Sequence, residues 1–226
     1  MCFSPTVSFA ASAALASAGI TSFKKTDTHK ETLFACVPLI FAAQQFIEGL
    51  LWLSLLSGTN EALRYLTTQA YTVFIGIIWP VFIPLSIWVL EPEPTRKRMI
   101  LPIIALGTSI GIYTLNLLYN YGVQASLIDS CCVIYENSLK QGEAERLTYL
   151  FATCAAYFLC SYRSVRLIGM ANLAGFVIAY YFYEINFASI WCFFAALIST
   201  MIYVYLERVH RRRLAPQSIA AYRSLR

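Results

Sequence analysis

The chain has 226 residues, of which 58% are hydrophobic and 13% are charged, and its mean hydropathy is +0.61. Soluble domains carry roughly a quarter charged residues, so this composition excludes a soluble globular fold and indicates an integral membrane protein. The net charge of +5 does not indicate a nucleic-acid partner, because the basic residues lie between and after the apolar segments, where membrane insertion accounts for them.

Seven segments are long and apolar enough to cross a bilayer, since a spanning helix needs about 20 mainly apolar residues. They are residues 3–23, 33–56, 68–90, 99–121, 146–162, 165–183 and 187–207. No positively charged region precedes the first segment, which is the reverse of a signal peptide, so we expect it to remain as a helix. The sequence therefore predicts an all-α bundle of seven transmembrane helices, with residues 1–207 as one domain and 122–145 as the one long connection.

The basic residues predict the orientation of this bundle. Of the 17 Lys and Arg residues, only Arg64, Lys140 and Arg146 lie on one side, and the other 14 lie on the opposite side. Cytoplasmic connections carry the excess of Lys and Arg, so we expect the N-terminus outside and the C-terminus in the cytosol. Residues 208–226 would form a basic juxtamembrane tail, and such clusters attract anionic lipids.

Polar residues interrupt the second span, which reads FAAQQFIEGLLWL around Gln44, Gln45 and Glu48. A charge near the middle of a membrane costs at least about 2.5–3.5 kcal/mol, so these side chains should face the bundle interior. Intramembrane polar groups gather toward the exterior, and Asn116 of the fourth span is one of them. We therefore expect a polar cavity that opens outward, with Glu48 as the charged residue near its floor, Gln44, Gln45 and Asn116 as its neighbours, and Trp52 as a wall.

The exterior cysteines form a second set of candidates. Cys2, Cys131 and Cys132 lie at or beyond the outer surface, and Cys192 lies in the outer third of the last span. The exterior is the oxidising side, so these thiols are candidates for redox chemistry or a disulfide. The two histidines lie in cytosolic connections and no lysine lies in a span, which excludes histidine-ligated haem or zinc and a retinal Schiff base within the bundle. We expect no cofactor.

Other features of the spans indicate packing. Small residues such as Ser8, Ser12, Gly107 and Gly111 let neighbouring helices approach closely. The segment WPVFIP, Trp79–Pro84, predicts a kinked third span, because proline removes backbone hydrogen bonds that must then be satisfied inside the bundle.

Several blocks of the sequence together resemble a family of bacterial polytopic membrane proteins of unknown function that open Met-Cys-Phe-Ser. The blocks are MCFSPTVSF, PLIFAAQQFIEGLLWL, LEP, LFATC, NLAG and SIWCFFAALIS, and the resemblance runs from residue 1 to about residue 206. The residues that carry it include Cys2, Ser4, Gln45, Glu48, Trp52, Glu91, Trp191 and Cys192. The resemblance implies residence in a bacterial cytoplasmic membrane and no particular activity.

The preferred interpretation is a membrane protein that binds a small molecule or a cation around Glu48, as a transporter or a sensor. Three alternatives stay open. Glu48 could be a neutral carboxyl that holds helices together by hydrogen bonds to glutamine or asparagine. An intramembrane enzyme would use Cys2 or Cys192 with Glu48. An accessory subunit of a membrane complex would have no site of its own.

Overall fold

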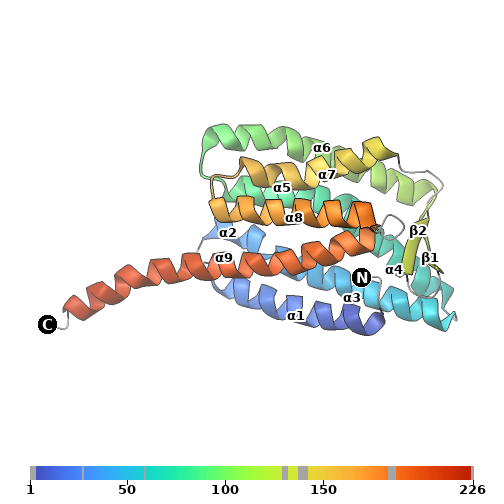
Figure 1. The fold of residues 1–226 in the computed structure, drawn as a ribbon, viewed down its shortest axis with the longest axis horizontal. Helices are drawn as coiled ribbons and strands as arrows, with labels where there is room; N and C mark the ends of the chain where they lie inside the picture. The colour runs from blue at the N-terminus through green and yellow to red at the C-terminus, as the bar shows by residue number, and fades with distance from the viewer. Residues whose placement is uncertain are drawn as a thin grey trace.

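Nearly all of the described chain is helical in the computed structural model, which describes residues 4–26, 28–58, 60–128, 132–136, 142–182 and 187–224. The elements are α1 (Pro5–Lys24), α2 (His29–Ala35), α3 (Val37–Ser57), α4 (Glu61–Val73), η1 (Phe74–Ile78), α5 (Trp79–Leu90), α6 (Pro94–Asn120), β1 (Gln124–Ile128), β2 (Cys132–Glu136), α7 (Glu143–Leu159), α8 (Arg163–Phe182) and α9 (Phe187–Ser224). The long helices lie side by side in one bundle, and α9 runs on beyond it (Figure 1). The all-α prediction is confirmed.

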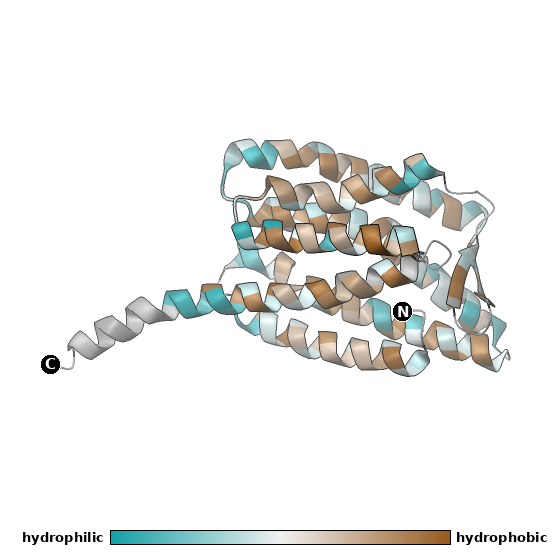
Figure 2. Ribbon diagram, in the orientation of Figure 1, coloured by the Kyte–Doolittle hydropathy of each residue, from teal (hydrophilic) through white to brown (hydrophobic). Residues whose placement is uncertain are grey.

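Five helical segments of the described chain are long and apolar enough to cross a membrane. They are Pro5–Lys24, His29–Ser57, Glu61–Leu90, Pro94–Asn120 and Arg163–Phe182. They correspond to five of the predicted spans, the first four and the sixth. Hydrophobic residues run along the middle of the bundle and hydrophilic ones gather toward its two ends (Figure 2). The length, composition and arrangement of these helices are those of a membrane protein.

Helices α1 and α3 pack against each other in opposite directions along most of their length. Ser12 Oγ on α1 donates a hydrogen bond to the backbone oxygen of Ala42 on α3 over 2.8 Å. Nearer the start of α1, the rings of Phe9 and Phe46 meet edge to face with their centroids 5.5 Å apart. The small residues of α1 therefore do what the sequence predicts, and they bring its backbone close to the polar part of α3.

The predicted distortion of the third span takes the form of a π-helical turn. This turn, η1, ends just before Trp79, and Pro80 and Pro84 follow within α5. Each proline lacks the N–H that would continue the helical ladder. Gly107 of α6 lies so close to this region that a Cβ built on it would stand 1.8 Å from the Pro80 carbonyl oxygen. The irregular backbone of α5 thus packs directly against α6.

A two-stranded antiparallel hairpin, β1–β2, lies within the connection between α6 and α7, where the sequence predicts only a long connection. Its register pairs Gln124 with Glu136 and Ile128 with Cys132. It covers the end of the bundle near the C-terminus of α3 and the start of α4 (Figure 1). The rings of Tyr71 on α4 and Tyr135 on β2 stack with centroids 4.7 Å apart. We call this end of the molecule the hairpin end.

Polar contacts join the connections at the opposite end, which we call the basic end because the α1–α2, α5–α6 and α7–α8 connections and the tail of α9 gather there (Figure 1). Glu91, fully buried after α5, accepts hydrogen bonds from the backbone N–H of Ser161 over 2.6 Å and from its hydroxyl over 2.5 Å. Arg96 and Arg166 donate to backbone carbonyls at the end of α7 and in the following turn. Glu91 therefore ties the α5–α6 connection to the α7–α8 connection.

Two ion pairs bind α9 to the first helices at this basic end. Lys25 pairs with Glu207, which also pairs with Arg211 over 2.6 Å. Glu31 of α2, whose side chain is 6% exposed, receives two hydrogen bonds from the guanidinium of Arg213, of 2.6 and 3.1 Å. The part of α9 that follows the predicted last span is thus anchored as far as Arg213.

Candidate functional site: a buried polar group on α3

The three polar side chains of the second predicted span all lie inside the bundle. Gln44, Gln45 and Glu48 are each 0% exposed. Gln45 Nε2 donates a hydrogen bond to Glu48 Oε2 over 3.0 Å, within one turn of α3. Glu48 therefore does not face lipid, in accordance with the cost of exposing a carboxyl group to hydrocarbon.

Gln44 and Gln45 are neighbours in sequence but make contacts in different directions, because successive residues of an α-helix are about 100° apart around its axis. Gln44 Oε1 accepts a hydrogen bond from Trp79 Nε1 of α5 over 2.6 Å. The Trp79 ring in turn stacks on Phe41, with ring centroids 3.9 Å apart. Gln44 thus fixes the position of an indole at the π-helical junction, while Gln45 turns to Glu48.

Two buried oxygen atoms, one on α1 and one on α3, lack hydrogen-bond partners among the described residues. They are Ser8 Oγ and Gln45 Oε1, and both residues are 0% exposed. Ser8 stands one turn before Ser12 on α1, and Ser12 contacts the carbonyl of Ala42 on α3. Since the two helices run in opposite directions, Ser8 lies at about the level of Gln45 and Glu48. We call Ser8, Gln45 and Glu48 the α1–α3 polar group.

The α1–α3 polar group contains a hydroxyl, an amide carbonyl and a carboxyl group within an apolar surrounding. Buried polar atoms in proteins nearly always have a partner, and a bound water or ion commonly fills that place where the protein itself does not. Oxygen atoms of these three kinds are the ligands preferred by hard cations, and they also hydrogen-bond water. The oxygen atoms of this group are thus of the kinds that bind a small cation or a water molecule.

The structure does not bring Asn116 to this group, contrary to the sequence-based expectation. Asn116 is exposed on α6, and its side-chain oxygen accepts a hydrogen bond from Asn120 Nδ2 over 2.7 Å. Its position along α6 gives its depth, but the packing of α6 turns it outward. Trp52 is 1% exposed and packs in a cluster with Leu51 and with Ala125 and Val133 of the hairpin. It is a support for the hairpin and does not line the cavity described below.

The expected outward-opening polar cavity with Glu48 at its floor does not correspond to the cavity that the structure shows among α3, α5, α7, α8 and α9. Glu48 is not among the residues that line this cavity. Trp79 links this cavity to the polar part of α3. It lines the cavity and donates a hydrogen bond to Gln44, which lies one turn before Glu48.

None of the four cysteine candidates has a described side chain. Cys2 and Cys131 lie outside the described residues, and so do the side chains of Cys132 and Cys192. Their thiol chemistry and the enzyme alternative therefore stay predictions. Within the described ranges, no group of three or more His, Cys, Asp or Glu residues could hold a metal ion.

The roles of two residues are not predicted by the sequence. From the sequence alone, Ser8 is interpreted as one of several small packing residues, and Trp79 as part of the proline-rich kink. The spacing of Ser8 and Ser12 places both on one face of α1, which is a signal for a polar contact along that face. No signal in the sequence pairs Trp79 with Gln44, because the two residues lie on different helices.

Comparison with protein families places the whole bundle in one group. A family of unknown function, DUF6629, matches residues 1–219. The match extends past the resemblance noted in the sequence, which stops near residue 206, and includes most of the basic tail. No curated protein and no solved structure matches the chain. The chain belongs to DUF6629, a family of unknown function.

Proposed function

We propose that the chain is a seven-span protein of a bacterial cytoplasmic membrane, with its N-terminus outside and its C-terminus in the cytosol. Five apolar helices support this proposal, together with α7 of 17 residues and α9 of 38 residues, which follow the remaining two predicted spans. The gathering of the basic connections at one end of the bundle, as Figure 1 shows, supports the orientation. A fluorescent protein fused after Arg226 should fluoresce, and a periplasmic reporter enzyme at that position should be inactive.

We propose further that the α1–α3 polar group binds a small cation, as part of a transporter or a sensor. The observation that carries this proposal is the buried Gln45 Oε1, which has no hydrogen-bond partner among the described residues although the same amide donates to Glu48. The Ser8 hydroxyl and the Glu48 carboxylate would complete a set of oxygen ligands. A carboxylate at Glu48 would make a cation a better ligand than a neutral molecule of the same size.

A thermal-stability titration tests this proposal. The full chain in lipid nanodiscs is heated in LiCl, NaCl or KCl, with choline chloride keeping the ionic strength constant. A ligand at about 100 times its dissociation constant stabilises the folded state by about 2.7 kcal/mol, which in a chain of this size raises the Tm by about 5–10 °C. We expect one of the three cations to give such a shift.

Matched variants decide whether the shift arises at the proposed site. Glu48→Gln and Ser8→Ala should remove the cation-dependent shift, whereas Glu61→Gln should retain it, because the Glu61 side chain is 88% exposed on α4. If no small cation stabilises the wild type, or if Glu48→Gln responds as the wild type does, the proposal is wrong. If the shift arises at this site, uptake of the stabilising cation into proteoliposomes would separate a transporter from a sensor.

We also propose that the tail of α9 contacts anionic lipids. Arg208, Arg211 and Arg212 are exposed, and their spacing places them close together on the surface of the helix. Anionic lipid should raise the Tm of the wild type, and replacing the three arginines with glutamine should reduce that effect. A variant as strongly stabilised as the wild type would contradict a lipid contact there.

A further inference from the structure

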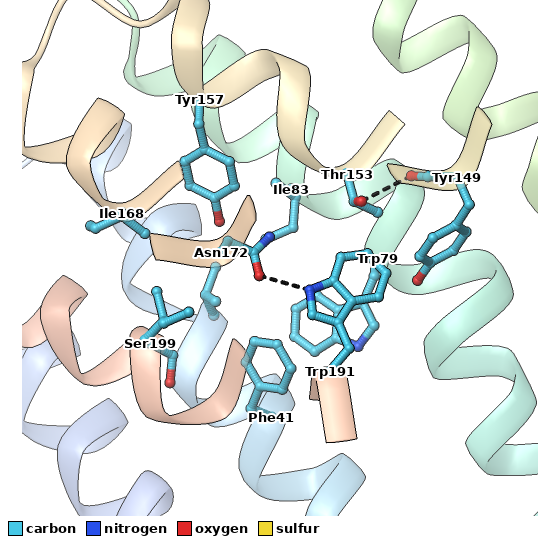
Figure 3. A pocket seen from close by; sticks show the side chains of 12 residues that line it. Phe41, Trp79, Ile83, Tyr149, Thr153, Tyr157, Ile168, Asn172, Trp191 and Ser199 are labelled. Atoms are coloured by element: carbon cyan, nitrogen blue, oxygen red, sulfur yellow. Dashed lines mark hydrogen bonds between the residues drawn. The ribbon is translucent and has the colours of Figure 1, made fainter. Parts of the chain in front are cut away.

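A second candidate site, apart from the α1–α3 polar group, is a mostly apolar cavity at the centre of the bundle. The cavity there has a volume of about 50 Å³ and lies among five helices, α3, α5, α7, α8 and α9. Its lining includes Phe41, Trp79, Tyr157, Asn172, Trp191 and Ser199 (Figure 3). A cavity needs a volume of about 10–15 Å³ to hold one water molecule. This cavity therefore has room for about three to five water-sized groups, or for a molecule of about four heavy atoms.

The described residues that line this cavity include no charged side chain. Its aromatic rings are largely engaged with one another: Trp79 stacks on Phe41, and Trp191 meets Tyr149 and Phe176 edge to face at centroid distances of 5.5 and 5.1 Å. A cation would lose its hydration here without gaining a carboxylate, and burying an uncompensated charge is costly. The lining therefore favours an uncharged occupant.

Asn172 supplies the hydrogen-bonding capacity of the cavity. It is 8% exposed, and its Oδ1 accepts a hydrogen bond from Trp191 Nε1 over 3.2 Å. Its Nδ2 donates to Cys154 Sγ over 3.3 Å, and sulfur is a weak acceptor. An amide offers two donors and two acceptor positions, so with respect to the described residues Asn172 retains one of each. Figure 3 shows its amide in the same space as the Tyr157 hydroxyl.

We propose that this cavity binds a small uncharged molecule with hydrogen-bonding groups, of the size of a simple amide or alcohol, with Asn172 as its anchor. The proposal goes beyond the cation site at Glu48, because the two sites share no residue and differ in charge. The aromatic walls exclude water from the contact, and the amide of Asn172 fixes the orientation of the ligand.

Tryptophan fluorescence tests the proposal directly, because two of the four tryptophans line the cavity. In the full chain with Trp52→Phe and Trp88→Phe, the emission comes from Trp79 and Trp191 alone. This background variant in nanodiscs is titrated with acetamide as the uncharged probe and with methylammonium chloride as a charged probe, which is smaller than acetamide and therefore is not excluded by its size. We expect acetamide to change the emission with saturation and methylammonium to give no saturable change.

Three variants in the same background locate the response. Asn172→Leu should raise the half-saturation concentration of acetamide about tenfold or more, which corresponds to the loss of one or two hydrogen bonds. Ser199→Val should abolish saturation by filling the cavity while leaving the amide in place, since the Ser199 hydroxyl donates to the carbonyl of Ala196 in its own helix, over 2.6 Å. Asn116→Leu is the matched control, because it removes an exposed amide on α6. It should respond to acetamide as the background variant does.

The outcomes separate this site from the cation site. Glu48→Gln should leave the acetamide response unchanged, so a failed cation titration does not affect this test. The proposal is wrong if the acetamide response is linear, if methylammonium gives the same saturable response, or if both Asn172→Leu and Ser199→Val retain the background affinity.

Discussion

The indole N–H of Trp79 on α5 donates a hydrogen bond of 2.6 Å to the side-chain oxygen of Gln44 on α3, and both residues are buried. This bond joins the polar part of α3 to the wall of the central cavity. It also holds the first residue after the π-helical turn η1, a type of irregularity that is frequent at functional sites. A residue that lines the cavity is therefore held by the residue that precedes Gln45 of the α1–α3 polar group on α3.

Replacing Trp79 with phenylalanine should destabilise the protein by about 1–3 kcal/mol, because the Gln44 oxygen then loses the partner that Trp79 provides in a buried environment. Trp88→Phe is the matched control. The N–H of Trp88 is buried without a hydrogen-bond partner among the described residues, so the same exchange removes no such bond. The Tm of both variants in nanodiscs measures the difference. Equal losses would show that the bond to Gln44 contributes nothing beyond ring packing.

Two glycines of α6 should respond in opposite ways to the same substitution. A Cβ at Gly107 would lie 1.8 Å from the Pro80 carbonyl oxygen, which belongs to the backbone and cannot turn aside. Gly107→Ala should therefore separate α5 from α6 and cost about 3 kcal/mol or more. At Gly111 the nearest atom, on the Ile77 side chain, would be 3.5 Å away, which is ordinary contact. Gly111→Ala should be neutral or stabilise the helix by up to about 1 kcal/mol.

Urea- or heat-induced unfolding of the two variants in the same detergent checks this contrast. A Gly107→Ala protein as stable as the wild type would show that α5 and α6 do not approach as closely as the structure has them. In the sequence the two glycines are equivalent, as small residues of the fourth span. The difference between them arises from the proline-distorted backbone of α5, which no local pattern in α6 records.

The sequence predicts the helical class and most helix positions because an apolar run of about 20 residues matches the thickness of a bilayer and is rare in soluble folds. It also predicts that Gln44, Gln45 and Glu48 face inward, because lipid penalises them. The outward orientation of Asn116 and the formation of the hairpin are not predicted, for two different physical reasons. Asn116 is an amide near a helix end, where exposure to the interface costs little, and the hairpin is held by contacts from α3 and α4 that are distant in sequence.

The pairings within the candidate site could not be predicted from the sequence. Ser8 on α1 and Gln45 on α3 lie at about the same level of the bundle because the two helices pack in opposite directions, with Ser12 bonded to the carbonyl of Ala42. Trp79, the first residue after η1, bonds to Gln44 on a different helix. Composition determines which residues avoid lipid, whereas the partner of each depends on helix order and rotation.

Glu91 should make stability depend on pH at the basic end. Burial alone would raise the pKa of its carboxyl group, but hydrogen bonds from Ser161 and from the backbone N–H of Glu93 outweigh burial and hold the pKa below its usual value. A lowered pKa in the folded state means that the stabilisation is fully present above the unfolded-state pKa and is lost as the pH falls through the folded-state pKa. The wild type should therefore lose stability below the usual carboxyl range.

Glu91→Gln should lower the Tm at pH 7, through the loss of charge-assisted hydrogen bonds worth about 1.5–3 kcal/mol, and should flatten the acid limb of the Tm–pH profile. Ser161→Ala should give a partial version of the same change. Glu93→Gln, an exposed residue that retains an oxygen to cap α6, is the control and should follow the wild-type profile. A Glu91→Gln profile parallel to that of the wild type would exclude Glu91 as the titrating group.

The anchoring of α9 to α2 should depend on one arginine of three consecutive ones. Arg213 makes two hydrogen bonds to Glu31, whose side chain is 6% exposed, whereas Arg212 is exposed. Arg213→Ala leaves a buried carboxylate without this partner, and because the Arg213 side chain is itself 38% exposed we expect a loss of about 1–3 kcal/mol, less than for a fully buried pair. Arg212→Ala should have almost no effect on stability, since exposed pairs contribute about 0–1 kcal/mol.

Hydrogen–deuterium exchange at residues 207–213 measures the anchoring locally, and it should rise in Arg213→Ala alone. Equal protection in the two variants would mean that Lys25 and Glu207 hold this part of α9 without the Glu31 pair.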